Sequence, residues 1–179
     1  RVARFFRDVA LAGNFDVTMF DLATSRRDPC STRIVQPKSF LKAPVIHRDH
    51  QHENLWRSGC HLAELEPLRY LQTSALRRRL AEFDLVQVVA GTPAWALAVR
   101  GIEAPIALQV ATTTKWERGP RDAARGLLGR RYRRAITEVV AQFDKQGARV
   151  PDATFIENQQ MLAWMRDAAR PDAVVRLIP

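Results

Sequence analysis

Two short apolar runs, joined by a turn and an apolar segment, constrain the fold of this chain more than any other feature. The runs are residues 85–89 and 106–110, and both are rich in β-branched side chains. Between them, Thr92 can cap a helix and Pro93 suits its first turn, with Gly91 just before. A crossover of this length joins parallel strands, so the sequence predicts a β-α-β unit whose strands are buried on both faces.

The remaining patterns extend this unit to a regular alternation of strands and helices. One domain is expected, because 179 residues with 46% hydrophobic content suffice for one core and would crowd two. The fold class predicted is α/β, a Rossmann-like doubly wound parallel sheet with helices on both faces. Further strands are predicted at residues 15–22, 34–40, 153–157 and 173–178, and a polar irregular segment at residues 44–59. Further helices are predicted at residues 2–13, 62–81, 121–142 and 159–169, the second of them with a break or late start at Pro67.

Composition excludes several classes of protein. No apolar run approaches the ~20 residues that a membrane-spanning helix needs. Cys30 and Cys60 are too few for a disulfide framework or a zinc site, so a reducing cytoplasm is the expected compartment. All four histidines lie between His47 and His61, but their alternate spacing lacks the i and i+4 ligand pair of helical zinc sites. We expect a polar connection and no metal, with acceptor contact by His47 or His50 left open.

Four stretches, in a fixed order along the chain, carry a family resemblance. They read FDVTMFDLATS, FDLVQVVAGTPAWALAVRGIEAPIALQVA, DATFIENQQMLAWM and VVRLIP, with a basic helical segment before the third. In this order they resemble the amino-terminal half of family 4 glycosyltransferases, and the resemblance covers almost the whole chain. No single diagnostic motif accompanies them.

The resemblance implies a GT-B architecture, in which two Rossmann-like domains face each other across a cleft. Sugar transfer in the family is metal-independent and retains the anomeric configuration. The amino-terminal half binds the acceptor, and the carboxyl-terminal half, absent here, binds the nucleotide-sugar donor. We therefore expect no cofactor on this chain and no activity of this fragment alone. The family's first strand normally precedes its first helix, so the sheet here is expected to lack that strand.

The loop after residues 106–110 carries the predicted catalytic groups. Relatives often have a histidine at this place, and here the chain reads Ala111-Thr112-Thr113-Thr114-Lys115-Trp116-Glu117. The hydroxyls of Thr112 and Thr113 can donate hydrogen bonds, and Glu117 can accept a proton from an acceptor hydroxyl. Lys115 can meet a phosphate. The alternative is a solvated loop with a capping threonine.

Two more strand ends offer polar groups for binding an acceptor. Gly91 and Thr92 precede a helix, whose amino terminus presents free N–H groups and a partial positive charge. Asn158 follows the strand at 153–157, where capping of the next helix is the favoured role. The predicted acceptor-binding set is Gly91, Thr92, Lys115 and Asn158.

Charge supplies a second signal. The net charge is +9 and the isoelectric point is near 10.7. An arginine-rich helix with an apolar side suits an anionic membrane surface, so we expect peripheral attachment at the inner membrane face. The alternatives are a general excess of arginine and a nucleic-acid-binding module, although no nucleic-acid-binding motif accompanies the charge. A nucleotide-dependent oxidoreductase is a weaker alternative, since no Gly-x-Gly-x-x-Gly motif follows a predicted strand. The predicted anion-binding set is Arg125, Arg130, Arg131, Arg133 and Arg134.

Overall fold

The structure is a computed structural model that describes residues 2–36, 38–39, 42–49, 55–122 and 127–178. The chain falls into two compact units. The first comprises Arg1–Arg69 and Thr73–Leu76, and the second comprises Tyr70–Gln72 and Arg77–Pro179. Each unit has its own sheet. That residues 1–179 form one domain stays a prediction.

The first unit combines one amphipathic helix with a three-stranded sheet. The predicted helix at residues 2–13 is confirmed as α1 (Val2–Ala12), and Asn14, with a positive φ of 61°, follows its end. Strand β1 (Met19–Leu22) pairs parallel with β3 (Leu55–Ser58), and β2 (Ile46–Arg48) pairs antiparallel with β3. The sheet order is therefore β1-β3-β2.

Two predictions for this unit are wrong. Among the described residues of 34–40 no strand forms, because Ser39 closes a turn: its hydroxyl donates to the carbonyl of Arg33 at 2.9 Å and accepts the Arg33 N–H at 2.8 Å. Residues 37 and 40 lie outside the described part. The segment 44–59, predicted as irregular, contains β2 and β3. These strands are three and four residues long and partly polar, so they carry little periodic signal.

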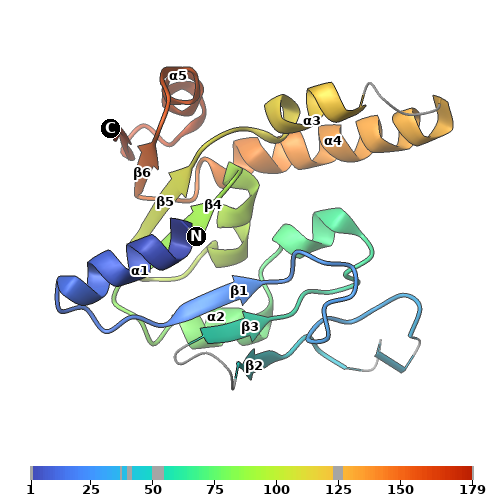
Figure 1. Ribbon diagram of the computed structural model, residues 1–179, viewed down its shortest axis with the longest axis horizontal. Coiled ribbons are helices and arrows are strands. Elements are labelled where there is room, and N and C mark those ends of the chain that lie inside the picture. The colour runs from blue at the N-terminus through green and yellow to red at the C-terminus, as the bar shows by residue number, and fades with distance from the viewer. Residues whose placement is uncertain (1, 37, 40–41, 50–54, 123–126, 179) are drawn as a thin grey trace. The chain divides into compact units, whose positions relative to one another are not determined.

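The second unit is a parallel sheet with helices between its strands (Figure 1). The sheet order is β4-β5-β6-β7, and every neighbouring pair is parallel. The predicted β-α-β unit and the α/β class with a parallel sheet are confirmed. Its elements are β4 (Val86–Ala90), η3 (Pro93–Val99), β5 (Ile106–Val110), α3 (Thr114–Asp122), α4 (Leu127–Gly147), β6 (Ala153–Ile156), α5 (Gln159–Ala168) and β7 (Val174–Leu177).

The helices depart from the prediction in three places. The segment after Thr92 forms a 3₁₀ helix, η3, in place of an α-helix. The helix expected at 62–81, with a break or late start at Pro67, is divided into η2 (Glu66–Tyr70) and α2 (Ser74–Leu80), so the break follows η2 and does not fall at Pro67. The Thr73 hydroxyl caps α2 by accepting the Leu76 N–H at 3.2 Å. The helix expected at 121–142 is α4, which runs on to Gly147, and α3 was not predicted at all.

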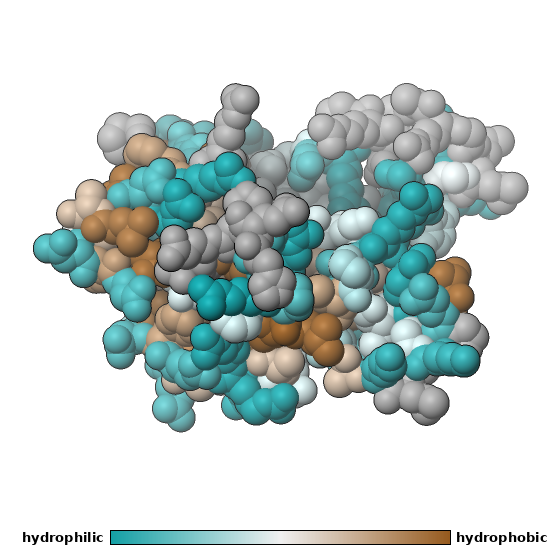
Figure 2. All heavy atoms as spheres, turned by 60° about the horizontal axis from the view of Figure 1, so that its bottom comes forward, coloured by the Kyte–Doolittle hydropathy of each residue, from teal (hydrophilic) through white to brown (hydrophobic). Residues whose placement is uncertain are grey.

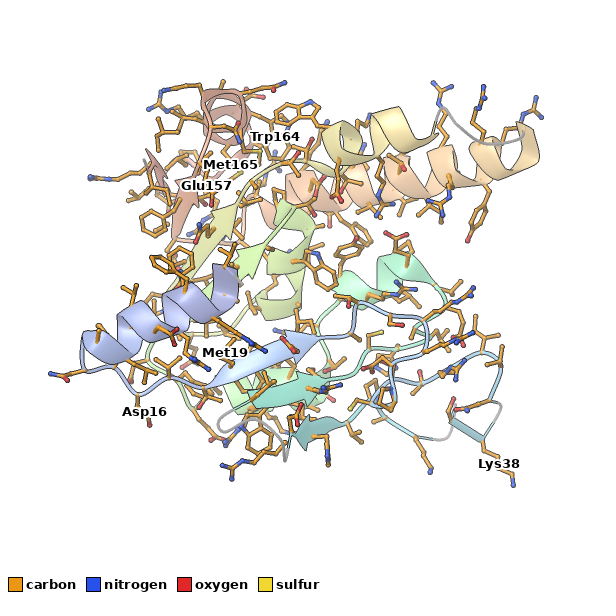
Figure 3. All side chains as sticks on the ribbon, viewed as in Figure 1. Asp16, Met19, Lys38, Glu157, Trp164 and Met165 are labelled. Carbon is orange, nitrogen blue, oxygen red and sulfur yellow. The ribbon has the colours of Figure 1, made fainter. Side chains whose placement is uncertain are left out.

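The core of the second unit is built around β5, which has a strand on each side. Leu108 and Val110 are fully buried, and Val110 lies in register with Ile156 of β6. From α5, Met161 and Met165 are fully buried as well, and Figure 3 labels Met165. A mostly apolar strand such as β5 is typical of a position with both faces covered.

Helix α4 packs closely on η3. Gly147 makes this approach possible: a Cβ at this position would lie 2.1 Å from the carbonyl oxygen of Pro93. Ala94 and Val140 are fully buried nearby in one apolar cluster, to which Tyr70 belongs. The ring of Tyr70 lies 4.5 Å from that of Trp95, between ring centroids. The small residues Gly147 and Ala94 thus let the backbones of α4 and η3 come within contact distance.

We predict that Gly147→Ala destabilises the protein by at least about 2 kcal/mol, because the added methyl group forces α4 away from η3. Gly129→Ala is the matched control on the same helix, since a Cβ there meets no atom within 4 Å. The control is expected to gain about 0.5–1 kcal/mol from helix propensity. Urea unfolding followed by circular dichroism measures both, and equal stability of the two variants would contradict the close packing.

Candidate functional site

Polar groups gather at the carboxyl ends of β4, β5 and β6, which lie along one edge of the parallel sheet. Open parallel sheets bind ligands at this edge. The backbone N–H of Thr112 donates to the carbonyl of Gly91 at 3.0 Å, joining the loops after β4 and β5. The side chain of Asn158 donates from Nδ2 to the carbonyl of Ala111 at 2.8 Å, joining the loops after β5 and β6. The structure therefore brings together three of the predicted strand ends.

The threonine hydroxyls at this edge differ in exposure. Thr92 and Thr113 are buried, whereas Thr112 is half-buried. The Thr113 hydroxyl accepts the Trp116 N–H at 3.4 Å, as a cap of α3 does. The Thr112 hydroxyl donates to the carbonyl of Thr113 at 3.4 Å, a long and weak contact. Gly91 is exposed, so Gly91 and Thr112 are the members of this group that a ligand can reach.

Lys115 and Glu117 lie in the first turn of α3, and both are exposed. The ammonium of Lys115 lies 2.7 Å from the carboxylate of Glu138 on α4. This contact lowers the pKa of the Glu138 carboxyl. Because both side chains are more than half exposed, the pair is weak and can exchange partners.

Asn158 is a helix cap, which confirms the favoured reading of its role. Its Oδ1 accepts the N–H of Met161 at 2.8 Å at the start of α5. Since Nδ2 is bonded to Ala111, the amide is engaged at both ends. Asn158 therefore fixes the geometry of the edge.

Asp144, on α4, stabilises the same edge and was not predicted from the sequence. Its carboxylate is 1% exposed and accepts two backbone N–H groups: Ala94 donates to Oδ1 at 3.1 Å, and Thr114 donates to Oδ2 at 2.7 Å. These donors belong to the first turns of η3 and α3, so one acid caps two helices.

Burial raises the pKa of Asp144 above its ordinary value of 3.8, and the hydrogen bonds from Thr114 and Ala94 oppose that rise. The buried hydroxyls of Thr92 and Thr114 also favour the charged form of Asp144, although neither reaches full hydrogen-bond geometry. Asp144 thus occupies the anion position at two helix amino termini that a ligand would otherwise use. The periodicity of α4 contains a signal for it, because Asp144 shares a helix face with the buried Val140 and Ala141.

A second polar pair, Gln109 and Glu157, connects β5 to the end of β6. The buried Gln109 donates from Nε2 to the carboxylate of Glu157 at 2.8 Å. Figure 3 labels Glu157 just beyond β6. The side-chain amide oxygen of Gln109, Oε1, is buried and has no hydrogen-bond partner among the described residues. The sequence analysis missed this pair, because a single glutamine within an apolar strand carries no recognisable motif.

The arginine-rich part of α4 extends beyond the region that packs on η3. From Gly129 to Ala135 every side chain is exposed, whereas Thr137 and Val140 further along are buried. In Figure 1 this first part of α4 extends past the end of α3, away from the sheet of the second unit. Arg125 lies outside the described residues. The exposed arginines, called the arginine arm below, are Arg130, Arg131, Arg133 and Arg134.

The histidine and cysteine residues form no metal site in the described part of the chain. Within it, no three His, Cys, Asp or Glu side chains are grouped to hold a metal ion, and His50 and His52 lie outside it. Cys30 and Cys60 are buried free thiols, and burial raises the pKa of both. Among the described helices none is long and apolar enough to cross a membrane.

A hollow of about 630 Å³ in the first unit is lined by Cys30, Ser31, Lys38 and Lys42, among others. Both lysines are exposed, and Lys38 points away from the protein in Figure 3. The Lys38 side chain therefore does not point into the hollow. This hollow is not taken as the functional site.

Comparison with known protein families, with curated proteins and with solved structures found no match. The catalytic and acceptor-binding roles assigned to the strand-end residues therefore stay predictions. They depend on the family resemblance of the sequence and on the geometry of this edge.

We predict that Asp144→Ala lowers the free energy of unfolding by about 2–4 kcal/mol, because two buried N–H groups lose their acceptor. Glu138→Ala on the same helix is the control, since it removes only an exposed ion pair and should change stability little. Thermal unfolding of both variants is the measurement. A wild-type melting temperature for Asp144→Ala would show that this carboxylate does not hold the two helices.

Proposed function

We propose that this chain is the acceptor-binding half of a retaining, metal-independent glycosyltransferase. The reaction moves a sugar from a nucleotide-sugar to a cell-envelope saccharide or a lipid-linked acceptor. The observation that carries the proposal is the joined edge at the carboxyl ends of β4, β5 and β6, which supports a hydroxyl-binding site. In this proposal the sheet belongs to a doubly wound Rossmann-like layer whose first strand lies outside the chain.

The exposed groups at the edge take the chemical roles. Gly91 offers backbone polar groups, and the Thr112 hydroxyl orients an acceptor hydroxyl. Glu117 accepts the proton of that hydroxyl, and Lys115 meets a phosphate after leaving Glu138. The Thr113 hydroxyl caps α3 and the Asn158 side chain caps α5, so both hold their loops in place.

The arginine arm supports peripheral attachment of a cytoplasmic protein to the inner membrane face. Four exposed guanidinium groups within five residues create a dense positive surface. Each such group near an anionic lipid surface contributes about 1 kcal/mol of attraction. An acceptor linked to a lipid would then meet the enzyme at the surface where it resides.

The acceptor site is tested by nuclear magnetic resonance of the ¹⁵N-labelled chain. Titration with an octyl-phosphate-linked N-acetylglucosamine is expected to shift the amide signals of Gly91 and Thr112. Thr112→Val, which keeps the shape and removes one hydrogen bond, should weaken binding about 3- to 10-fold. Thr18→Val, a half-buried threonine in the first unit, serves as the control.

The same experiment contains the outcomes that contradict the proposal. Signal shifts confined to other parts of the chain would move the site away from the strand ends. The donor should bind elsewhere in the full enzyme, so uridine and guanosine diphosphate sugars are expected to bind very weakly. Calorimetric binding of either in the micromolar range would refute the assignment of this chain to the acceptor half.

The arginine arm is tested by co-sedimentation with vesicles of anionic or neutral lipid. The double variant Arg131→Glu/Arg133→Glu should lose at least about tenfold in binding to anionic vesicles. Arg149→Glu/Arg166→Glu changes the net charge equally at exposed positions outside the arm and should retain more binding. Equal loss in both double variants would attribute binding to net charge alone.

The arm also supports a second candidate, a basic nucleic-acid-binding module without catalysis. Exposed arginines attract phosphates of any source, and Tyr132 among them offers a ring for stacking. A duplex or single-stranded oligonucleotide that binds more tightly than anionic vesicles at the same salt concentration would favour this candidate over the membrane.

A further inference from the structure

Helix α1 presents an apolar face that its own unit leaves largely exposed. None of its residues is buried, and three members of the apolar face are 52–62% exposed. Figure 2 shows hydrophobic side chains at the surface among mostly hydrophilic ones. The apolar face is Val2, Phe5, Phe6 and Val9, spaced i, i+3, i+4 and i+7, and the opposite face is Arg4, Arg7, Asp8 and Leu11, with the same spacing.

The opposite face of α1 carries two arginines and one aspartate. Arg4 is exposed, and Arg7 is paired with Asp8 at 2.7 Å, so the helix itself contributes little net charge. The chain as a whole has a net charge of +9. Apolar insertion by α1 and electrostatic attraction by the rest of the chain are therefore separate contributions, of which salt screens only the electrostatic one.

The size of the apolar face decides between a lipid surface and a second protein. At 1.5 Å per residue, an 11-residue helix is about 16 Å long and about 10 Å wide, so its face offers only about 160 Å². A stable protein interface buries about 800 Å² on each partner. A lipid surface needs no such area, because an amphipathic helix enters it with its apolar side alone.

We propose that α1 is an interfacial membrane anchor, whose apolar face inserts among lipid acyl chains at an anionic bilayer surface. The phenylalanines and valines of that face bury in the lipid, and Arg4 and Arg7 remain in the water and headgroup layer. This anchor does not depend on the acceptor site or on sugar transfer. It also differs from the arginine arm, because apolar insertion is not screened by salt.

Two glutamate variants on opposite faces of α1 test the anchor. Val9 is 53% exposed and Leu11 is 48% exposed, so Val9→Glu and Leu11→Glu add the same charge at equally open positions. The measurement is co-sedimentation with vesicles of phosphatidylcholine and phosphatidylglycerol, at low salt and at about 0.5 M NaCl, where charge attraction is largely screened. Because neither residue is buried, both variants should keep the wild-type circular dichroism spectrum and melting temperature.

The expected result is a loss of at least about tenfold in lipid partitioning for Val9→Glu, and a change within about twofold for Leu11→Glu, with the difference maintained at high salt. Equal behaviour of the two variants would overturn the anchor. So would loss of wild-type binding at high salt, which would leave only electrostatic attachment. A concentration-dependent dimer in sedimentation equilibrium that Val9→Glu abolishes would assign the face to a second copy of the chain. The sugar titration of Thr112→Val is independent of all these outcomes.

Discussion

The edge of the second unit at the carboxyl ends of β4 and β5 depends on the hydrogen bonds that the buried carboxylate of Asp144 accepts. One side chain of α4 accepts the first N–H groups of η3 and α3, which begin directly after two neighbouring strands. Removing water from a charged group costs free energy, and the raised pKa of Asp144 reflects that cost. The hydrogen bonds from the two helix starts offset it. The loops after β4 and β5 are thereby held in a fixed position relative to α4.

This arrangement has a consequence for ligand binding. Helix amino termini after parallel strands are common anion sites, but here the protein's own acid occupies two of them. The groups at the edge that Asp144 does not bind and that solvent reaches are Gly91, the half-buried Thr112, and Lys115 and Glu117 in the first turn of α3. Such an edge suits a neutral, hydroxyl-bearing ligand better than a phosphate held by helix termini. That preference agrees with an acceptor-binding role.

The two proposed surface contacts act by different physics. The arginine arm attracts anions over a distance set by the salt concentration, and its attraction is not directional. The apolar face of α1 acts only on contact, through removal of apolar area from water. Neither contact requires the strand-end site to be occupied. Under these proposals, membrane attachment and catalysis can therefore be changed separately by substitution.

The sequence alone determined the elements whose signal is local: the runs at β4 and β5, the helix α1, and the β6-α5-β7 succession, each placed to within about two residues. It failed where the signal is weak or where a distant partner decides. The segment near Arg33 turns because Ser39 binds it. Strand β2 forms by pairing with β3, and β3 pairs with both β1 and β2. Only the tertiary structure revealed Asp144, since its role depends on N–H groups 30 and 50 residues away. Periodicity reports which face of a helix is buried, and it cannot report what that face meets.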